Sequence, residues 1–166
     1  MSRYSSVRRV TMRDLQVRTD EGQPWTMVTA YDALTAGVIE QAGVPALLVG
    51  DSAAMVVHGH DSTIPITVDD MLPLVSAVVR GTEQALVVAD LPFGSYQEGP
   101  AQALATSARF MKEAGAHAVK LEGGQSVLPQ IEALAEAGVP VIGHLGLTPQ
   151  SVNLLGGYRV QGRGES

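Results

Sequence analysis

The sequence predicts an α/β protein built on a parallel sheet, and three observations support this. Apolar runs of strand length alternate with longer stretches of helical period, an alternation typical of β/α units. The hydrophobic content is 45% with only 4% aromatic residues, so the core must consist mainly of Val, Leu, Ile and Ala, which suits strands covered by helices. Polar side chains follow the ends of all five predicted strands.

Two architectures, an open doubly wound sheet and a closed barrel, fit this alternation. Ligands bound by an open doubly wound sheet gather at one switch point, whereas a barrel binds them with residues from many strand ends. The third observation therefore favours a barrel, although a chain of 166 residues has the length of an open sheet and a barrel needs roughly 250.

The first two β/α units are marked by apolar runs and by glycine. Residues 26–30 (TMVTA) form the first predicted strand, and a helix follows from Asp32 to about Gln41, with Gly43 as its stop signal. Residues 45–50 (PALLVG) form the second strand. After a long loop, Thr67 has the features of a helix N-cap with acidic residues in the first turn, and Gly81 ends that helix.

The remaining units repeat the pattern. The third predicted strand is 85–90 (ALVVAD), and the fourth is 118–123 (AVKLEG). Helices are expected at about 100–114 and 126–137, each followed by a glycine, and the fifth strand is 140–145 (PVIGHL). Thr148 and Pro149 then open one more short helix before a glycine-rich tail.

Charge and composition exclude several classes of function. The net charge of −6 and the lack of clustered Lys and Arg argue against a nucleic-acid partner. The absence of Cys excludes disulfides and thiolate-bound zinc. Neither a signal-peptide core nor a membrane-spanning apolar run is present, so we expect a cytoplasmic protein that does not contact membranes.

The candidate functional residues share one position, the end of a predicted strand. They are Tyr31 and Asp32, Asp51 and Ser52, Asp90, Lys120 and Glu122, and His144. Carboxylates that follow apolar runs are partly desolvated, which is costly unless a cation or hydrogen bonds compensate them. The carboxylates of Asp51, Asp90 and Glu122, with no Cys nearby, indicate a site for a hard cation such as Mg²⁺.

Lys120 and Glu122 are two residues apart on one strand, so their side chains point to the same face. If that face is the barrel interior, Lys120 supplies the positive charge that an anionic substrate needs in an acidic protein.

Structural roles compete with these functional ones. Asp32 is better explained as a helix cap than as a catalytic residue, and capping also accounts for Asp51 or Asp90 taken singly. Lys120 and Glu122 are compatible with a structural ion pair, and His144 with a core histidine.

His58 and His60 flank a glycine but lack an obvious third zinc ligand. The paired glycines at 123–124 and 156–157 make no phosphate-loop fingerprint and are assigned to loop geometry.

Several segments resemble a known family. They read TAYD at 29–32, VGDS at 49–52, ADLPF at 89–93, VKLEGG at 119–124, GHLGLTPQS at 143–151 and GGYRVQGRG at 156–164. Together, from about Val10 onward, they closely resemble the ketopantoate hydroxymethyltransferases of pantothenate synthesis.

The resemblance implies a (β/α)8 TIM-type barrel, of which residues 1–166 are the first five or so β/α units, in a cytoplasmic homo-oligomer, commonly a decamer. It implies Mg²⁺-dependent transfer of a hydroxymethyl group from 5,10-methylenetetrahydrofolate to 2-oxoisovalerate. In this enzyme the keto acid chelates the metal, loses the proton next to its keto group and attacks the one-carbon unit. By the same resemblance, Asp51, Asp90 and Glu122 bind the metal, while Asp51, Ser52, Asp90 and Lys120 contact the keto acid; His144 and Tyr31 are expected to support them.

One expectation follows from the end of the sequence. In the family a glutamate on the strand after the GGYxVQGR segment acts as general base, and the chain ends at Ser166 before that strand. We therefore expect residues 1–166 alone to bind ligands without turnover. The alternatives are a metal–enolate barrel enzyme of the phosphoenolpyruvate mutase and isocitrate lyase type, and a non-catalytic truncated assembly module.

Overall fold

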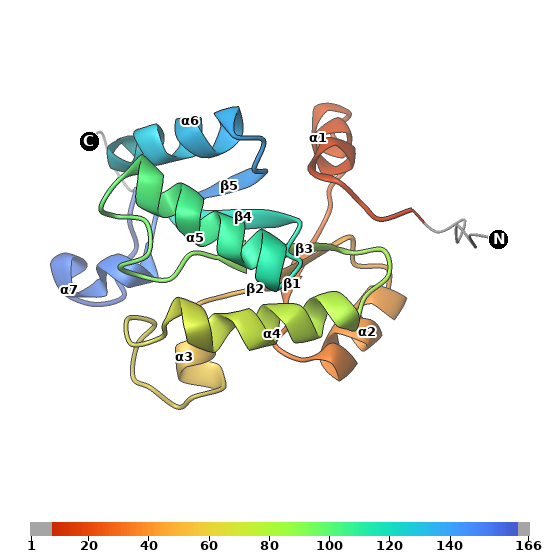
Figure 1. Ribbon diagram of the computed structural model, residues 1–166, viewed down its shortest axis with the longest axis horizontal. Helices are drawn as coiled ribbons and strands as arrows, with labels where there is room; N and C mark the ends of the chain where they lie inside the picture. The colour runs from red at the N-terminus through yellow and green to blue at the C-terminus, as the bar shows by residue number, and fades with distance from the viewer. Residues whose placement is uncertain (1–7, 163–166) are drawn as a thin grey trace.

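The computed structural model describes residues 8–162, which form one five-stranded parallel sheet with helices packed along it (Figure 1). The strands are β1 (Met27–Thr29), β2 (Ala46–Val49), β3 (Leu86–Asp90), β4 (Ala118–Glu122) and β5 (Val141–His144). The helices are α1 (Met12–Asp20), α2 (Ala33–Gln41), α3 (Ala53–Val56), α4 (Val68–Arg80), α5 (Pro100–Glu113), α6 (Leu128–Glu136) and α7 (Val152–Leu155), with 3₁₀ turns η1 (Gln125–Val127) and η2 (Pro149–Ser151).

The order of the strands decides between the two architectures. The strands lie in the order β1-β2-β3-β4-β5, so each pairs with its neighbours in sequence. A doubly wound sheet reverses its order at a switch point, whereas a β/α barrel lays its strands down consecutively. The described residues therefore form a partial barrel of five strands, as the polar strand ends predicted.

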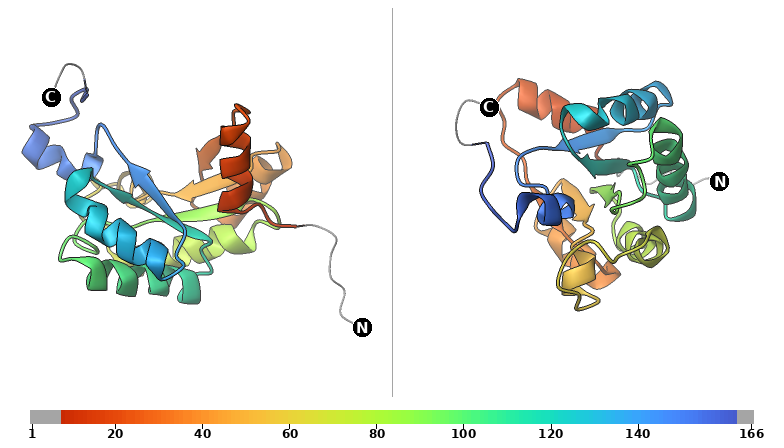
Figure 2. Two further views of the ribbon diagram at one scale, coloured as in Figure 1. Left: turned by 90° about the horizontal axis from the view of Figure 1, so that it is seen from above. Right: turned by 90° about the vertical axis from the view of Figure 1, so that its left-hand side faces the viewer.

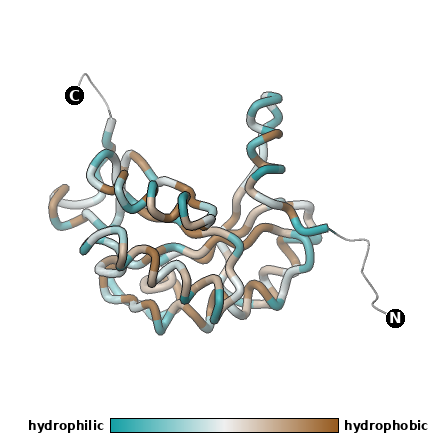
Figure 3. The backbone as a smooth tube through the Cα atoms, turned by 45° about the horizontal axis from the view of Figure 1, so that its top comes forward, coloured by the Kyte–Doolittle hydropathy of each residue, from teal (hydrophilic) through white to brown (hydrophobic). Residues whose placement is uncertain are grey.

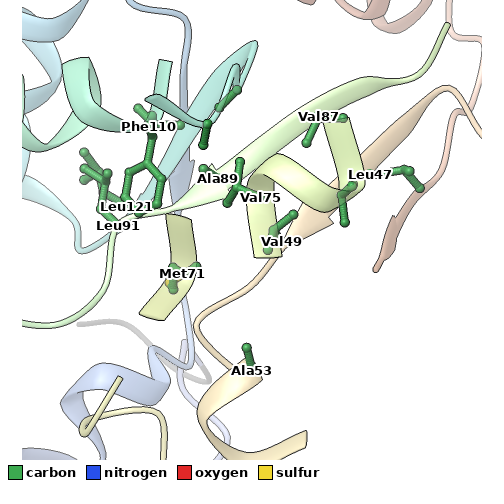
Figure 4. Packing of buried hydrophobic residues seen from close by; sticks show 14 of the residues in the cluster. Leu47, Val49, Ala53, Met71, Val75, Val87, Ala89, Leu91, Phe110 and Leu121 are labelled. Carbon is green, nitrogen blue, oxygen red and sulfur yellow. The ribbon is translucent and has the colours of Figure 1, made fainter. Parts of the chain in front are cut away.

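The outer face of the sheet is the one covered by the connecting helices. Alternate residues of the strands point to it, and α4, α5 and α6 lie along it (Figures 1 and 2). Figure 4 shows Val75 of α4 beside Ala89 of β3, and Phe110 of α5 beside Leu121 of β4. These side chains are fully buried and form the main core. In Figure 3 hydrophobic residues run through the strands and the inward sides of these helices, while hydrophilic residues concentrate on the outer turns.

The inner face carries the other set of strand residues. Ala46, Leu86, Val88 and Ala118 form a second cluster with Leu15 of α1. These residues lie at or near the starts of their strands, so α1 covers that end of the inner face, while α7 lies at the opposite end of the sheet (Figure 1). Helix α1 was not predicted from the sequence, although Thr11 and Asp14 form a capping box at its start.

The predicted helix boundaries hold with small changes. Asp32 caps α2 by accepting the main-chain N–H of Thr35 at 2.8 Å, which confirms the capping role. Thr67 and Asp70 form the capping box of α4. The helix expected from residue 126 begins with the 3₁₀ turn η1 instead, and α6 starts at Leu128 with a proline in its first turn. Gly81 ends α4 in an ordinary helical conformation; a Cβ there would lie 2.3 Å from the carbonyl oxygen of Ala33, so its role is to let α2 and α4 approach closely.

None of the helices in the described part of the chain combines the length and the apolar content needed to cross a bilayer.

Candidate metal and keto-acid site

A cavity of about 500 Å³ opens at the carboxyl ends of the strands. Its charged and polar lining consists of Asp51, Ser52, Thr63, Asp90, Lys120, Glu122 and His144. Its apolar lining includes Met27, Leu48, Ile142 and Leu145. All the charged residues that the sequence placed at strand ends, apart from the helix cap Asp32, therefore meet in one cavity.

The pairing of the strands explains why these side chains meet. Asp90 of β3 lies directly opposite Lys120 of β4, and Glu122 of β4 lies opposite His144 of β5. Lys120 and Glu122 are two residues apart and point to the same inner face, as predicted. Asp51 comes two residues after the end of β2, and its main-chain N–H donates to Asp90 Oδ2 at 3.3 Å.

Lys120 is the buried cation of the cavity. Its Nζ lies 2.7 Å from Asp90 Oδ1 and 3.9 Å from Glu122 Oε1, and its side chain is 8% exposed. The short ion pair with Lys120 compensates the buried Asp90 Oδ1. One ammonium group thus faces more than one carboxylate.

Glu122 is held from two sides. His144 Nδ1 lies 3.1 Å from Glu122 Oε1, and the main-chain N–H of Gln150 donates to Oε2 at 3.0 Å. His144 Nδ1 is also 3.4 Å from Lys120 Nζ. His144 therefore contacts both charged residues of β4 and belongs to the site rather than to the core.

Burial shifts the acidity of all three carboxyl groups in the same direction. Desolvation raises the pKa of Asp90 to about 7, against the opposing effect of Lys120. Desolvation also raises the pKa of Asp51 and of Glu122, and the hydrogen bonds from Gln150 oppose it in both cases. Burial destabilises the ionised form of each of these three carboxyl groups. Binding of a further cation in the cavity would therefore be favourable.

The carboxylates share the cavity without forming a ready coordination group. Within residues 8–162, no set of three or more His, Cys, Asp or Glu side chains is arranged to hold a metal ion. The carboxylates are instead paired with protein donors: Lys120 contacts Asp90, and Gln150 donates to Asp51 and Glu122. The Mg²⁺ site expected at Asp51, Asp90 and Glu122 therefore stays a prediction.

Tyr31 and Ser52 form the remaining part of the predicted site. Ser52 lines the cavity, and its Oγ lies 2.8 Å from the hydroxyl of Tyr31, which does not line it. Tyr31 thus contacts a residue that lines the cavity, and its supporting role stays a prediction. His58 and His60 stack with ring centroids 6.3 Å apart but do not line this cavity.

Three residues of the site were missed by the sequence analysis. Gln150 is buried and donates its side-chain amide to Asp51 Oδ2 at 2.8 Å. Tyr96 donates its hydroxyl to Gln150 Oε1 at 2.7 Å. Thr63 is buried against the cavity, near the carboxylate of Asp51. All three come from segments outside the strands, where neither strand period nor a charge pattern marks them.

Structures of known proteins resemble this fold at low sequence identity. A 2,3-dimethylmalate lyase of the PEP mutase/isocitrate lyase superfamily aligns with a TM-score of 0.60 and 22% identity, over 81% of this chain and 52% of the other. A phosphonopyruvate hydrolase solved with oxalate and Mg²⁺ aligns with a TM-score of 0.65 and 18% identity, over 78% and 50% of the two chains. These matches support the α/β fold.

Sequence comparison is more specific. The chain is 68% identical over 161 residues to a 3-methyl-2-oxobutanoate hydroxymethyltransferase of Thermobifida fusca, covering 97% of this chain and 58% of that protein. It is 65% identical over 158 residues to the enzyme of the same name from Frankia casuarinae, covering 95% and 53%. The chain thus spans little more than half the length of these relatives. A sequence model of ketopantoate hydroxymethyltransferase matches residues 9–166. The chain therefore belongs to the ketopantoate hydroxymethyltransferase family.

Proposed function

We propose that this chain carries the metal-binding and keto-acid-binding part of a 3-methyl-2-oxobutanoate hydroxymethyltransferase, which transfers a hydroxymethyl group from 5,10-methylenetetrahydrofolate in pantothenate biosynthesis. The observation that carries the proposal is the meeting of three buried carboxylates and one buried lysine in a single cavity at the strand ends. The names of the Thermobifida fusca and Frankia casuarinae relatives support the same activity.

Mg²⁺ fits the chemistry of this cavity. Asp51, Asp90 and Glu122 offer only oxygen ligands, which hard divalent cations prefer, and all three are buried. When bound, Mg²⁺ supplies a Lewis acid that polarises a keto oxygen and acidifies the adjacent C–H group. The three carboxylates are the residues that would hold it, together with oxygens from water and substrate.

The keto acid fits the rest of the lining. The Nζ of Lys120 is fixed beside Asp90 and faces a cavity wide enough for a small metabolite, so it offers positive charge to the substrate carboxylate. The hydroxyl of Ser52, held by Tyr31, offers a further hydrogen bond. Met27, Leu48 and Ile142 provide an apolar wall for the branched alkyl group of 2-oxoisovalerate.

The proposed contribution of these residues to catalysis is binding and orientation. Lys120 and Ser52 would fix the substrate carboxylate, so that the carbon next to the keto group is presented in one direction. Burial of the polar residues excludes water from their contacts and strengthens the electrostatic interactions within the cavity.

A second candidate is a lyase or phosphonate enzyme of the PEP mutase/isocitrate lyase type. The observation that favours it is the resemblance of the fold to solved members of that superfamily. The two candidates differ in substrate: one uses 2-oxoisovalerate, and the other cleaves an acid such as 2,3-dimethylmalate.

Calorimetry on the purified chain tests the proposal. We expect Mg²⁺ to bind, and 2-oxoisovalerate to bind only in its presence, with 2,3-dimethylmalate as the control ligand. Binding of the keto acid without Mg²⁺, or tighter binding of 2,3-dimethylmalate, would count against the proposed function.

A further inference from the structure

Gln150 lies at the centre of the hydrogen bonds that surround the candidate metal site. It belongs to η2, the short turn after β5, and is only 5% exposed. Its main-chain N–H donates to Glu122 Oε2 at 3.0 Å, and its side-chain Nε2 donates to Asp51 Oδ2 at 2.8 Å. One residue therefore contacts carboxylates that come from two different strand ends.

The orientation of the Gln150 amide is fixed by its surroundings. A glutamine amide has two N–H donors and one carbonyl acceptor. The second N–H donates to the carbonyl oxygen of Leu91 at 2.9 Å, while Oε1 accepts from the Tyr96 hydroxyl at 2.7 Å and from Gln97 Nε2 at 3.4 Å. Exchanging the amide oxygen and nitrogen would set oxygen against oxygen at Asp51 and Leu91. Only the observed orientation satisfies every group.

Tyr96 extends the same network to the main chain of β4. Its hydroxyl oxygen accepts the N–H of Glu122 at 3.3 Å, and the ring is buried with 1% exposure. The donor that orients Gln150 is thus itself tied to Glu122. The turn after β5, the loop after β3 and the ends of β2 and β4 are locked together through these two side chains.

We propose that Gln150 is a positioning residue for the metal site, fixing the carboxylates of Asp51 and Glu122 at one cavity, from which they can reach Mg²⁺. This inference rests on the proposed function, because it assigns Gln150 a role towards the metal. Residues that hydrogen-bond to metal-ligating carboxylates typically alter metal affinity 10- to 100-fold when they are replaced. Gln150 acts through Asp51 and Glu122 and is not itself counted among the metal ligands.

The test measures Mn²⁺ affinity by electron paramagnetic resonance, with Mn²⁺ as a spectroscopic probe for Mg²⁺, on the 166-residue chain and its variants. Gln150→Met keeps the main-chain bond to Glu122 but removes the donors to Asp51 and Leu91. We expect roughly 10-fold or greater loss of Mn²⁺ affinity. Tyr96→Phe keeps the bonds from the Gln150 amide to Asp51 and Leu91 and, among the contacts of this amide, removes only the donor to Gln150 Oε1, so we expect a smaller loss.

Gln130→Met is the matched control. Gln130 is also a buried glutamine, 6% exposed, and its Nε2 donates to the main-chain oxygen of Tyr96 at 3.2 Å, outside the cavity. We expect this variant to lower the melting temperature and to leave Mn²⁺ affinity unchanged.

The outcomes separate the two proposals. Equal Mn²⁺ affinity in the wild-type chain and in Gln150→Met would overturn the role of Gln150 and leave the metal site standing. Equal losses in Gln150→Met and Gln130→Met would show a structural effect and also overturn it. Failure of the wild-type chain to bind Mn²⁺ would overturn the metal site and, with it, this inference.

Discussion

His117 satisfies both main-chain hydrogen-bonding groups of Val87. The N–H of Val87 donates to His117 Nδ1 at 3.0 Å, and the N–H of His117 donates to the carbonyl oxygen of Val87 at 2.9 Å. His117 directly precedes β4 and Val87 lies in β3, so the imidazole joins the starts of two central strands. Burial, with a smaller contribution from Arg9, lowers the pKa of His117 to about 4.

This contact predicts a pH-dependent free energy of unfolding. The pKa of the histidine is near its ordinary value of 6.5 in the unfolded chain and about 4 in the folded one, so between these pH values the unfolded chain binds more protons. The contribution of neutral His117 to the free energy of unfolding is complete above pH 6.5 and is lost as the pH falls towards 4. One pKa unit is worth about 1.4 kcal/mol, and partial exposure of the ring reduces the full shift to an expected loss of about 1–2 kcal/mol.

Urea unfolding of the wild-type chain and of His117→Asn checks this. The Asn side chain can accept from the N–H of Val87 but does not titrate, so the difference in free energy between the two proteins should depend on pH in this window. A constant difference from pH 7.5 to pH 4.5 would show that His117 does not carry the effect.

The second prediction concerns Asp90→Asn. The substitution keeps the shape of the side chain and removes a charged hard ligand, so we expect Mg²⁺ affinity to fall at least ~10-fold with the far-UV circular dichroism unchanged. Calorimetric titration measures the affinity. Unchanged Mg²⁺ binding would remove Asp90 from the proposed metal site.

The third prediction concerns Lys120→Met, which keeps much of the apolar stem and removes the charge. We expect the affinity for 2-oxoisovalerate to fall by more than the ~1 kcal/mol of an exposed ion pair, because the Lys120 side chain is only 8% exposed. Lys112→Met is the control, since Lys112 is exposed on α5. If both variants bind the keto acid as the wild-type chain does, Lys120 has only a structural role.

The fourth prediction concerns the contact between α2 and α4. A Cβ at Gly81 would lie 2.3 Å from the carbonyl oxygen of Ala33, whereas a Cβ at Gly143 would meet only Ile131 Cδ1 at 4.0 Å. We expect Gly81→Ala to cost about 1–3 kcal/mol of stability and Gly143→Ala to be close to neutral. Equal stabilities in chemical denaturation would show that the helices separate without cost.

The strands and the charged part of the site could be predicted from the sequence for related reasons. A strand buried on both faces leaves a continuous apolar run, and a charged residue at its end is conspicuous, as with Asp90 after Leu86–Ala89. Helix α1 was missed because its mean hydropathy is low and only Leu15 is buried. Gln150 could not be predicted, because its partners Asp51, Leu91 and Tyr96 lie far from it in sequence and are brought together only by folding.

The consecutive strand order also bears on how the chain acquires its structure. Every strand after β1 pairs with the strand that precedes it directly in sequence. During synthesis, the partner of each new strand has therefore already been made and lies at the edge of the growing sheet. Synthesis proceeds at roughly 5–20 residues per second, far more slowly than helices and turns form. The sheet can therefore grow by one β/α unit at a time from its N-terminal end. Because Gln150 follows the fifth strand, the network that joins Asp51 to Glu122 would be completed only after the strands it connects.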